Sequence, residues 1–300
     1  MAQKEQIDLT GAAGLTAFSV LLAYNQVVIA VVNEGLQPVF FAALRSAGSA
    51  VLVFLWLKLR RRPLSVAPGV VGPGLILGCV FSLEFIFLFT ALDLTTVVRT
   101  SIIFYTMPLW LAFLGHFLLP GERLTPTKMA GQALAFLGVG IAIVFRGGDG
   151  GGGNLVGDLA ALAAAICWAG IALIARGTKL KTVAPDVQLL WQLTVSIPIL
   201  FLASLAFGPW VRELAPIHLW GLGFQIVFIS FAGFAFWLWL LSIYPAASVA
   251  AFSFLAPVFG VWMGWWLLDE PIGTPIFVAL GLVVAGLILI NRPAQVPQKV

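Results

Sequence analysis

The chain has 300 residues, of which 61% are hydrophobic and only 9% are charged, whereas ordinary soluble domains contain about 25% charged residues. This composition excludes a soluble globular protein and predicts an integral membrane protein. The formal net charge of +4 arises from basic residues scattered between apolar runs, so a nucleic-acid partner is not expected.

Apolar segments follow one another along almost the whole chain. The N-terminus mixes Lys4 with Glu5 and Asp8 and lacks the features of a cleaved signal, so the first apolar segment is expected to be retained as a helix. A bilayer core of about 30 Å requires roughly 20 apolar residues per helix. Segments that meet this requirement are predicted at residues 11–32, 38–58, 70–92, 96–118, 126–145, 155–176, 185–207, 217–243, 246–268 and 273–291.

The basic residues predict the orientation of these ten helices, because cytoplasmic loops carry the excess of Lys and Arg. With the N-terminus inside, only Arg146 and Arg212 fall on the outer side. Both termini are therefore expected to be cytoplasmic. The basic residues on the cytoplasmic side would be Lys4, Lys58, Arg60, Arg61, Arg62, Arg123, Lys128, Arg176, Lys179, Lys181, Arg292 and Lys299.

A glycine-rich stretch, RGGDGGGGNLVGD at residues 146–158, interrupts the apolar pattern halfway along the chain. No Gly-Lys-Ser/Thr follows it, so a flexible linker is favoured over a phosphate-binding loop. The predicted domains are a first five-helix repeat at residues 1–147, a linker at 148–154 and a second five-helix repeat at 155–300.

The two halves repeat one pattern. FYTMPLWLAFLGHFLLPGE at residues 104–122 is matched by SFLAPVFGVWMGWWLLDEP at 253–271, which pairs Pro108 with Pro257. Because each half has an odd number of spans, the second copy would enter the membrane from the opposite side, as in the inverted repeats of transporters. The matched prolines are predicted hinges beside a central cavity, and the alternative is a kink that only improves packing.

These motifs resemble the drug/metabolite transporter superfamily in its ten-helix EamA-type form. The resemblance covers nearly the whole chain and rests on GERLTP (121–126), GQALAFLGVGIAIVFRGG (131–148), LLDEPIGTP (267–275) and ALGLVVAGLILI (279–290). It implies an exporter or exchanger of small metabolites in the bacterial inner membrane, without an ATPase, and amino-acid exporters of the YddG type belong to this family. The second half departs from the pattern, with Asp269-Glu270 where the first half has Gly-Glu-Arg.

Three ionisable residues within predicted spans are candidates for a function in the membrane, namely Arg45, Glu84 and Arg99. Charges in the membrane are costly and commonly functional. An arginine could attract a substrate carboxylate, and Glu84 could meet an ammonium group or carry a proton. The alternative is a structural ion pair of Glu84 with Arg99 or Arg45, and Arg99 alone could extend to the interface.

Mid-span aromatic and uncharged polar residues could together complete an apolar ligand site, although helix packing is the favoured explanation for any single aromatic residue. The helix-end residues Glu122 and Glu270 are expected to act as helix caps or loop anchors. Pro108 and Pro257 are the predicted hinges. The predicted substrate-binding residues are Tyr24, Asn25, Arg45, Phe81, Glu84, Arg99, Tyr105, Trp168, Trp191, Gln192, Trp237 and Ser253.

The resulting prediction is a monomeric secondary transporter that exports amino acids or similar small metabolites by alternating access, with no cofactor or metal. A flippase or exchanger of a lipid-linked or phosphorylated metabolite is the alternative. An intramembrane enzyme is not expected, because HExxH, GxSxG and a clustered His/Cys/carboxylate set are absent from the sequence. Few and unrepeated charges disfavour a passive channel.

Overall fold

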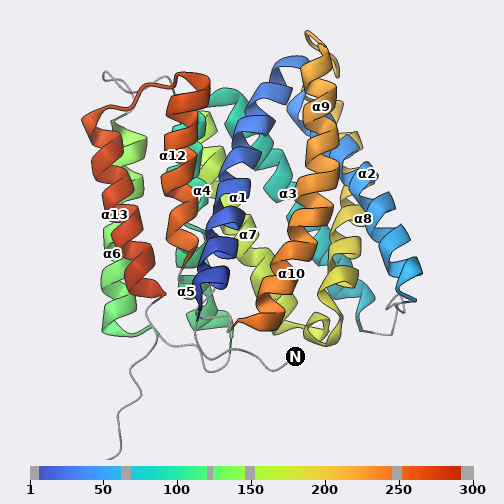
Figure 1. The fold of residues 1–300 in the computed structure, drawn as a ribbon, viewed down its shortest axis with the longest axis horizontal. Helices are drawn as coiled ribbons and strands as arrows, with labels where there is room; N and C mark the ends of the chain where they lie inside the picture. The colour runs from blue at the N-terminus through green and yellow to red at the C-terminus, as the bar shows by residue number, and fades with distance from the viewer. Residues whose placement is uncertain (1–6, 62–68, 120–123, 146–152, 245–251, 292–300) are drawn as a thin grey trace, which may run out of the picture.

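The computed structural model describes residues 7–61, 69–119, 124–145, 153–244 and 252–291, and in these residues it contains helices and no β-strand. Figure 1 shows them as one bundle. We call the end at which α1 begins, at the bottom of Figure 1, the lower end, and the opposite end the upper end.

The first half contains α1 (Leu9–Gly35), α2 (Pro38–Leu59), α3 (Val71–Leu94), α4 (Val97–Phe104), α5 (Met107–Leu118) and α6 (Pro126–Val144). The second half contains α7 (Leu155–Gly177), η1 (Lys179–Thr182), α8 (Pro185–Ser204), α9 (Pro216–Phe224), η2 (Gln225–Gly233), α10 (Phe234–Ile243), η3 (Phe252–Phe254), α12 (Leu255–Leu268) and α13 (Thr274–Ile290).

The described helices make this a multi-pass membrane protein. Eight of them are long and apolar enough to cross a bilayer, with α4 and α5 counted together and α9, η2 and α10 counted together. The apolar helices Phe252–Leu268 and Thr274–Ile290 are shorter. The predicted count of ten spans therefore remains a prediction for these last two.

The fourth predicted span differs from expectation. The sequence predicts one helix over 96–118 with a bend at Pro108, but the structure has two helices, α4 and α5, separated at Tyr105 and Thr106. Pro108 lies in the first turn of α5, where a missing N–H costs no helical hydrogen bond. Pro257 likewise lies in the first turn of α12, directly after η3. Pro108 therefore follows a helix break, and Pro257 follows a change from 3₁₀ to α-helix.

The two halves pack through corresponding helices. α6 packs on α13, α2 on α8 and α4 on α12, and in each pair the two helices hold the same place in their halves. The contact of α3 with α7 has its counterpart in the contact of α9 and η2 with α1. Such reciprocal pairing is what a two-fold relationship produces. In Figure 1 the α6 and α13 pair lies at one side of the bundle and the α2 and α8 pair at the other.

Corresponding helices also run in opposite directions. The N–H of Asn154, which precedes α7, donates to the carbonyl of Leu94 at the end of α3. Arg212 bonds to both Asp93, near the end of α3, and Asn33, near the end of α1. The ends of α1 and α3 and the start of α7 thus share the upper end of the bundle. α7 therefore runs downward, whereas its counterpart α1 runs upward.

Candidate functional site

Arg45 and Glu84 form the centre of the candidate site. At 1.5 Å per residue, Arg45 lies about 10 Å along α2 from its upper end, and Glu84 lies about 15 Å below the upper end of α3. Their side chains are buried, with 7% and 6% exposed. The two charges are close enough to interact electrostatically. Within the described part of the chain, however, they form no ion pair within 4.0 Å.

The guanidinium of Arg45 is oriented by three groups. Its Nε donates to Ser230 Oγ at 3.0 Å, and its carbon lies 4.5 Å from the centre of the Phe85 ring and 5.8 Å from that of Phe89. No described residue accepts a hydrogen bond from its two terminal nitrogens. These nitrogens form the planar fork that binds carboxylates in a bidentate manner. The contacts therefore hold Arg45 in place and leave this fork available.

Ser230 belongs to η2, a π-helical stretch within an otherwise α-helical segment from Pro216 to Ile243. π-Helical turns are rare and occur frequently at functional sites. Arg45 comes from the first half of the chain and Ser230 from the second. The candidate site is therefore built across the junction of the two halves.

Aromatic rings surround these charges on the α3 and α7 sides. The Phe81 ring lies 4.1 Å from that of Phe85, which contacts Arg45. In α7, Cys167 is close enough to Glu84 to be affected by its charge. Its neighbour Trp168 stacks on Phe104 with ring centres 4.9 Å apart. Tyr105, Phe81 and Trp168 from the predicted set thus lie in the elements that enclose Arg45 and Glu84.

Buried amides and hydroxyls extend the polar region into α1 and α4. Gln26 is fully buried, and its Oε1 accepts from Ser101 Oγ at 2.6 Å, while its Nε2 has no partner among the described residues. The carbonyl of Asn25 accepts from Gln225 Nε2 at 3.2 Å. Tyr105 reaches the same helix, donating from its hydroxyl to the carbonyl of Leu22 at 2.8 Å. Leaving a buried amide group without a hydrogen bond is costly. A polar solute or a water molecule that enters this region would supply the missing hydrogen bond.

Arg99 lies in a different environment from the one predicted. It is fully buried, and its Nη2 forms an ion pair with Asp158 at 2.6 Å, while its Nε donates to the same carboxylate at 3.0 Å. Nη2 also donates to the carbonyl of Ala142, and Thr95 donates to Asp158. Of the two alternative ion pairs of Glu84, the one with Arg99 is not formed, because the start of α7 brings Asp158 to α4. The contacts of Arg99 join α4, α6 and α7.

The other predicted residues lie away from the central pair. Trp237 stacks on Phe18 with ring centres 4.8 Å apart, in a small cluster near the lower end. Ser253 accepts from Asn291 at the lower ends of α12 and α13. The Tyr24 ring meets Phe224 edge-on and is 40% exposed. Trp191 lies against Gly74 of α3, and the neighbouring Gln192 is half-buried on α8.

Glu270 is a helix cap, as the sequence predicts. Its two carboxylate oxygens accept from the N–H groups of Val97 and Val98 at 2.7 Å each, at the start of α4. The positive end of a helix dipole favours a carboxylate here. Burial raises the pKa of Glu270 above its ordinary value, and the two backbone hydrogen bonds act in the opposite direction. Glu122, the predicted counterpart, lies outside the described residues.

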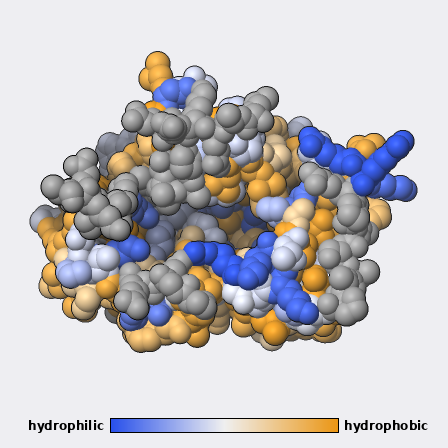
Figure 2. All heavy atoms as spheres, turned by 90° about the horizontal axis from the view of Figure 1, so that it is seen from below, coloured by the Kyte–Doolittle hydropathy of each residue, from blue (hydrophilic) through white to orange (hydrophobic). Residues whose placement is uncertain are grey.

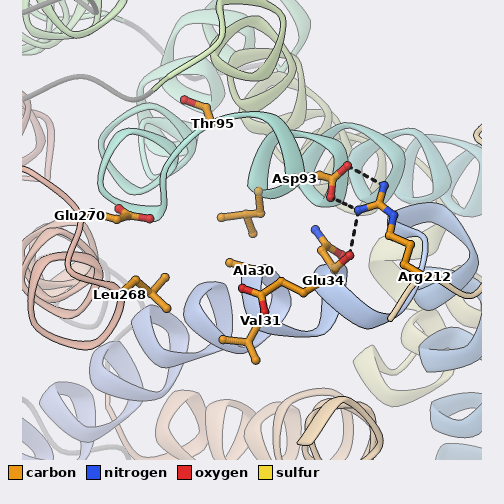
Figure 3. A pocket seen from close by; sticks show the side chains of 10 residues that line it. Ala30, Val31, Glu34, Asp93, Thr95, Arg212, Leu268 and Glu270 are labelled. Carbon is orange, nitrogen blue, oxygen red and sulfur yellow. Dashed lines mark hydrogen bonds and ion pairs between the residues drawn. The ribbon is translucent and has the colours of Figure 1, made fainter. Parts of the chain in front are cut away.

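A pocket of about 330 Å³ opens at the upper end of the bundle. Figure 3 shows it between α1, α3 and the segment after α12, with the ion pair of Asp93 and Arg212 at one side and Glu270 at another. At the lower end, Figure 2 shows a hollow near the centre of the bundle, with hydrophilic residues along one side. In the described ranges, no group of three or more His, Cys, Asp and Glu side chains could hold a metal ion.

The sequence predicts Arg45 and Glu84 as site residues but misses other buried polar residues of the bundle. Asp158 lies within the predicted span 155–176, and only the packing of α7 against α4 shows that it pairs with Arg99. Gln26 and Gln225 stand in apolar runs. An amide side chain within such a run is a sequence signal that could have identified both residues. Cys167 stands in an apolar run, and its sequence position gives no sign of Glu84.

Comparisons with known proteins agree with this architecture. The model of the EamA-like transporter family matches the chain twice, at residues 9–144 and 155–292. An uncharacterized transporter of Bacillus subtilis strain 168, YoaV, is 24% identical over 92% of this chain and 94% of its own. A probable amino-acid metabolite efflux pump of Escherichia coli strain K12 is 28% identical over 91% of this chain and 93% of its own.

A solved crystal structure shares the fold, with a TM-score of 0.65 and 20% sequence identity over 92% of this chain and 94% of the other. The family model covers most of the sequence in two successive copies, in agreement with the duplicated pattern and the reciprocal helix packing. The chain belongs to the EamA-like transporter family and is a multi-pass membrane transporter.

Proposed function

We propose that this transporter exports amino acids, with Arg45 binding the substrate carboxylate and Glu84 its ammonium group. The observation that carries the proposal is the pair of opposite charges, buried near the middle of the bundle without a direct ion pair between them. Leaving two charges buried and uncompensated is costly. A zwitterion would compensate both at once, and one end of it would match each residue.

The surroundings of the pair support a substrate of limited size with an apolar side chain. Phe85 and Phe89 stand beside Arg45, and Phe104 stacks on Trp168 next to Cys167. Small-ligand sites are typically lined by such rings, with a few fixed polar groups that orient the ligand. Aliphatic and aromatic amino acids are therefore the expected substrates. The similarity to a probable amino-acid metabolite efflux pump also supports this class.

Transport would proceed by alternating access in a bacterial inner membrane, with the lower end facing the cytoplasm. The orientation is supported by basic residues at the lower end, among them Lys58, Arg60, Lys128 and Arg176, because such residues favour the cytoplasmic side. The opposite directions of α1 and α7 support an inverted repeat. Since Arg45 and Ser230 come from different halves, relative motion of the halves would change access to the site. A single chain would suffice as the working unit.

The proposal is tested by uptake of a panel of radiolabelled amino acids into proteoliposomes. We expect saturable uptake that is inhibited by unlabelled amino acids, and a weaker effect of analogues that lack either the carboxylate or the amino group. In the wild type, an amino acid should inhibit uptake more strongly than its decarboxylated amine does. Arg45→Met should abolish this difference in inhibition. Glu84→Gln should abolish the difference between an amino acid and its deaminated acid.

Arg60→Met is the matched control for Arg45→Met. Arg60 follows the lower end of α2, and its guanidinium stacks on Trp56 at 4.1 Å, away from the candidate site. This variant should transport like the wild type. Uptake of no amino acid by folded protein would contradict the proposal and favour another metabolite or a lipid-linked substrate. Unaltered competition profiles in both site variants would contradict the assigned roles.

The same preparation tests whether Glu84 carries a proton. The charged or titratable groups that interact with it from neighbouring helices are Arg45 of α2 and Cys167 of α7. If Glu84 couples transport to protons, a pH gradient should accelerate uptake by the wild type and leave Glu84→Gln unaffected. An equal response of both proteins would assign Glu84 to substrate binding alone.

A further inference from the structure

A short antiparallel pairing joins the two halves at the upper end of the bundle. Leu36, in the turn between α1 and α2, pairs with Val211 in the connection between α8 and α9. The N–H of Gln37 donates to the carbonyl of Trp210, and the N–H of Arg212 donates to the carbonyl of Gly35, both at 2.9 to 3.0 Å. We call residues 35–37 and 210–212 together the upper strap.

Side chains reinforce the upper strap from both halves. Arg212 donates to both oxygens of Asp93, at 2.5 and 2.9 Å, and to the carbonyl of Asn33 at 2.8 Å. Gln37 donates from its Nε2 to the carbonyl of Ser204 at 2.7 Å. Figure 3 shows Arg212 reaching from its own segment to Asp93 of α3 at the wall of the upper pocket. The strap therefore ties α1, α2 and α3 to the α8 to α9 connection.

Close contact at Gly35 positions the second segment of the strap. A Cβ atom on Gly35 would lie 1.8 Å from Nδ1 of His218, so only glycine allows the His218 ring to occupy its place. The ring is buried at 5% exposure, and its Nδ1 accepts from the N–H of Ala215. The connection before α9 is thus held against the end of α1 by shape as well as by hydrogen bonds.

The described residues join the two halves differently at the two ends. The upper end carries the strap. At the lower end Tyr244 donates from its hydroxyl to Asp8 Oδ1 at 2.6 Å, and Figure 2 shows a hollow near the centre of that face. We propose that the upper strap is the outer gate of the transporter, which is closed in this structure and must separate for substrate to leave at the upper end. This inference rests on the proposed alternating access. It assigns the closing contacts to Gly35–Gln37, Trp210–Arg212 and Asp93.

The strap consists of interactions that can form and break repeatedly. The Asp93 and Arg212 side chains are 19% and 37% exposed, and partly exposed ion pairs hold weakly. Backbone hydrogen bonds between two short segments can be exchanged for hydrogen bonds to water once the segments part. A gate needs this balance, because two conformations of similar free energy must both be populated.

A disulfide across the strap tests the proposal directly. Leu36 and Val211 form a non-hydrogen-bonded antiparallel pair, whose Cα atoms lie about 4.5 Å apart in ordinary sheets, within the range of about 4.4 to 6.8 Å that disulfides require. The double variant Leu36→Cys/Val211→Cys should therefore cross-link on oxidation. The single variants Leu36→Cys and Val211→Cys, treated identically, are the matched controls.

Oxidation of the double variant should reduce amino-acid transport by at least about tenfold, because the state open at the upper end is no longer populated. Reduction should restore transport, and neither single variant should respond. Full transport by quantitatively cross-linked protein would overturn the proposed gate. Absence of transport in the reduced double variant and in the wild type would instead refute the amino-acid substrate.

A second measurement tests the gate without any substrate. Cys167 lies near Glu84 and is partly exposed, so it reports access to the candidate site. A membrane-impermeant maleimide applied at the upper side should label Cys167 faster in Asp93→Ala/Arg212→Ala than in the wild type, and more slowly in the oxidised double variant. Cys167→Ser identifies the labelled residue. Equal labelling rates in the three proteins would overturn the proposed gate.

Discussion

Gly131 of α6 and Gly286 of α13 lie in direct backbone contact. A Cβ atom on Gly131 would lie 2.8 Å from the carbonyl oxygen of Gly286, and one on Gly286 would lie 2.5 Å from that of Gly131. Gly138 makes the equivalent approach to the carbonyl of Ala279, at 2.8 Å. Because Gly138 and Gly286 are counterparts in the repeat, as are Gly131 and Ala279, the two contacts are reciprocal. Small residues allow this approach between membrane helices.

Replacing Gly131 by Ala should destabilise the protein. The added methyl group would meet a backbone oxygen that cannot move independently, and such overpacking costs about 1 to 3 kcal/mol. Thermal unfolding in detergent measures the effect. Gly140→Ala is the control, since Gly140 lies in the same helix with no atom within 4 Å of its added Cβ. It should stabilise by up to about 1 kcal/mol through helix propensity, and equal effects of both substitutions would contradict the close packing.

The buried ion pair of Arg99 and Asp158 should be essential for folding and dispensable for substrate recognition. Asp158→Asn leaves Arg99 buried without a counter-charge, which costs about 3 to 5 kcal/mol. The double variant Arg99→Met/Asp158→Leu should recover much of this stability and retain amino-acid transport. Thermal unfolding and uptake assays check the two parts. If the double variant is stable but has lost substrate selectivity, Arg99 contributes to substrate binding.

Glu270 should make the folding stability dependent on pH. Because burial raises its pKa in the folded protein, the folded state takes up a proton more readily than the unfolded state. The stability that this group contributes is therefore greatest below the ordinary carboxyl pKa of about 4.3 and is lost as the pH rises through the raised pKa. The melting temperature of the wild type relative to that of Glu270→Gln should increase as the pH falls from the raised pKa of Glu270 toward about 4.3. A relative stability that instead falls on acidification would mean that the two backbone hydrogen bonds lower the pKa.

Pro108 and Pro257 should affect the rate of transport more than the fold. Each lies in the first turn of an α-helix, Pro108 after the interruption at Tyr105 and Thr106 and Pro257 after the 3₁₀ turn η3, and proline hinders formation of one continuous α-helix at such a junction. Alanine at either position would allow the helix to continue and would stiffen the junction. Pro108→Ala and Pro257→Ala should therefore transport more slowly while unfolding near the wild-type temperature. Unchanged rates in both variants would remove the hinge role, and Pro198→Ala in α8 provides a comparison at an internal proline.

Much of the architecture follows from local properties of the sequence. A membrane offers no hydrogen bonds to the backbone, so long apolar runs form helices whatever their neighbours are. The duplicated prolines and glycines likewise reveal the two halves, because a repeat is visible without any contact being known. The charges of Arg45 and Glu84 stand out for the same reason, since a charge in an apolar run is conspicuous wherever it packs.

Partners between distant segments required the tertiary structure. Whether Arg99 meets Glu84 or Asp158 depends on how α7 crosses α4, and whether Arg45 is held by Ser230 depends on the π-helical turn of η2. The upper strap joins residues 35–37 to 210–212, and no local pattern marks either segment. By itself the sequence determined the membrane class, the repeat and the two central charges, because these depend on residue type and spacing. Only packing decided which charges were paired and where the halves were joined, because these contacts bring together residues far apart in the chain.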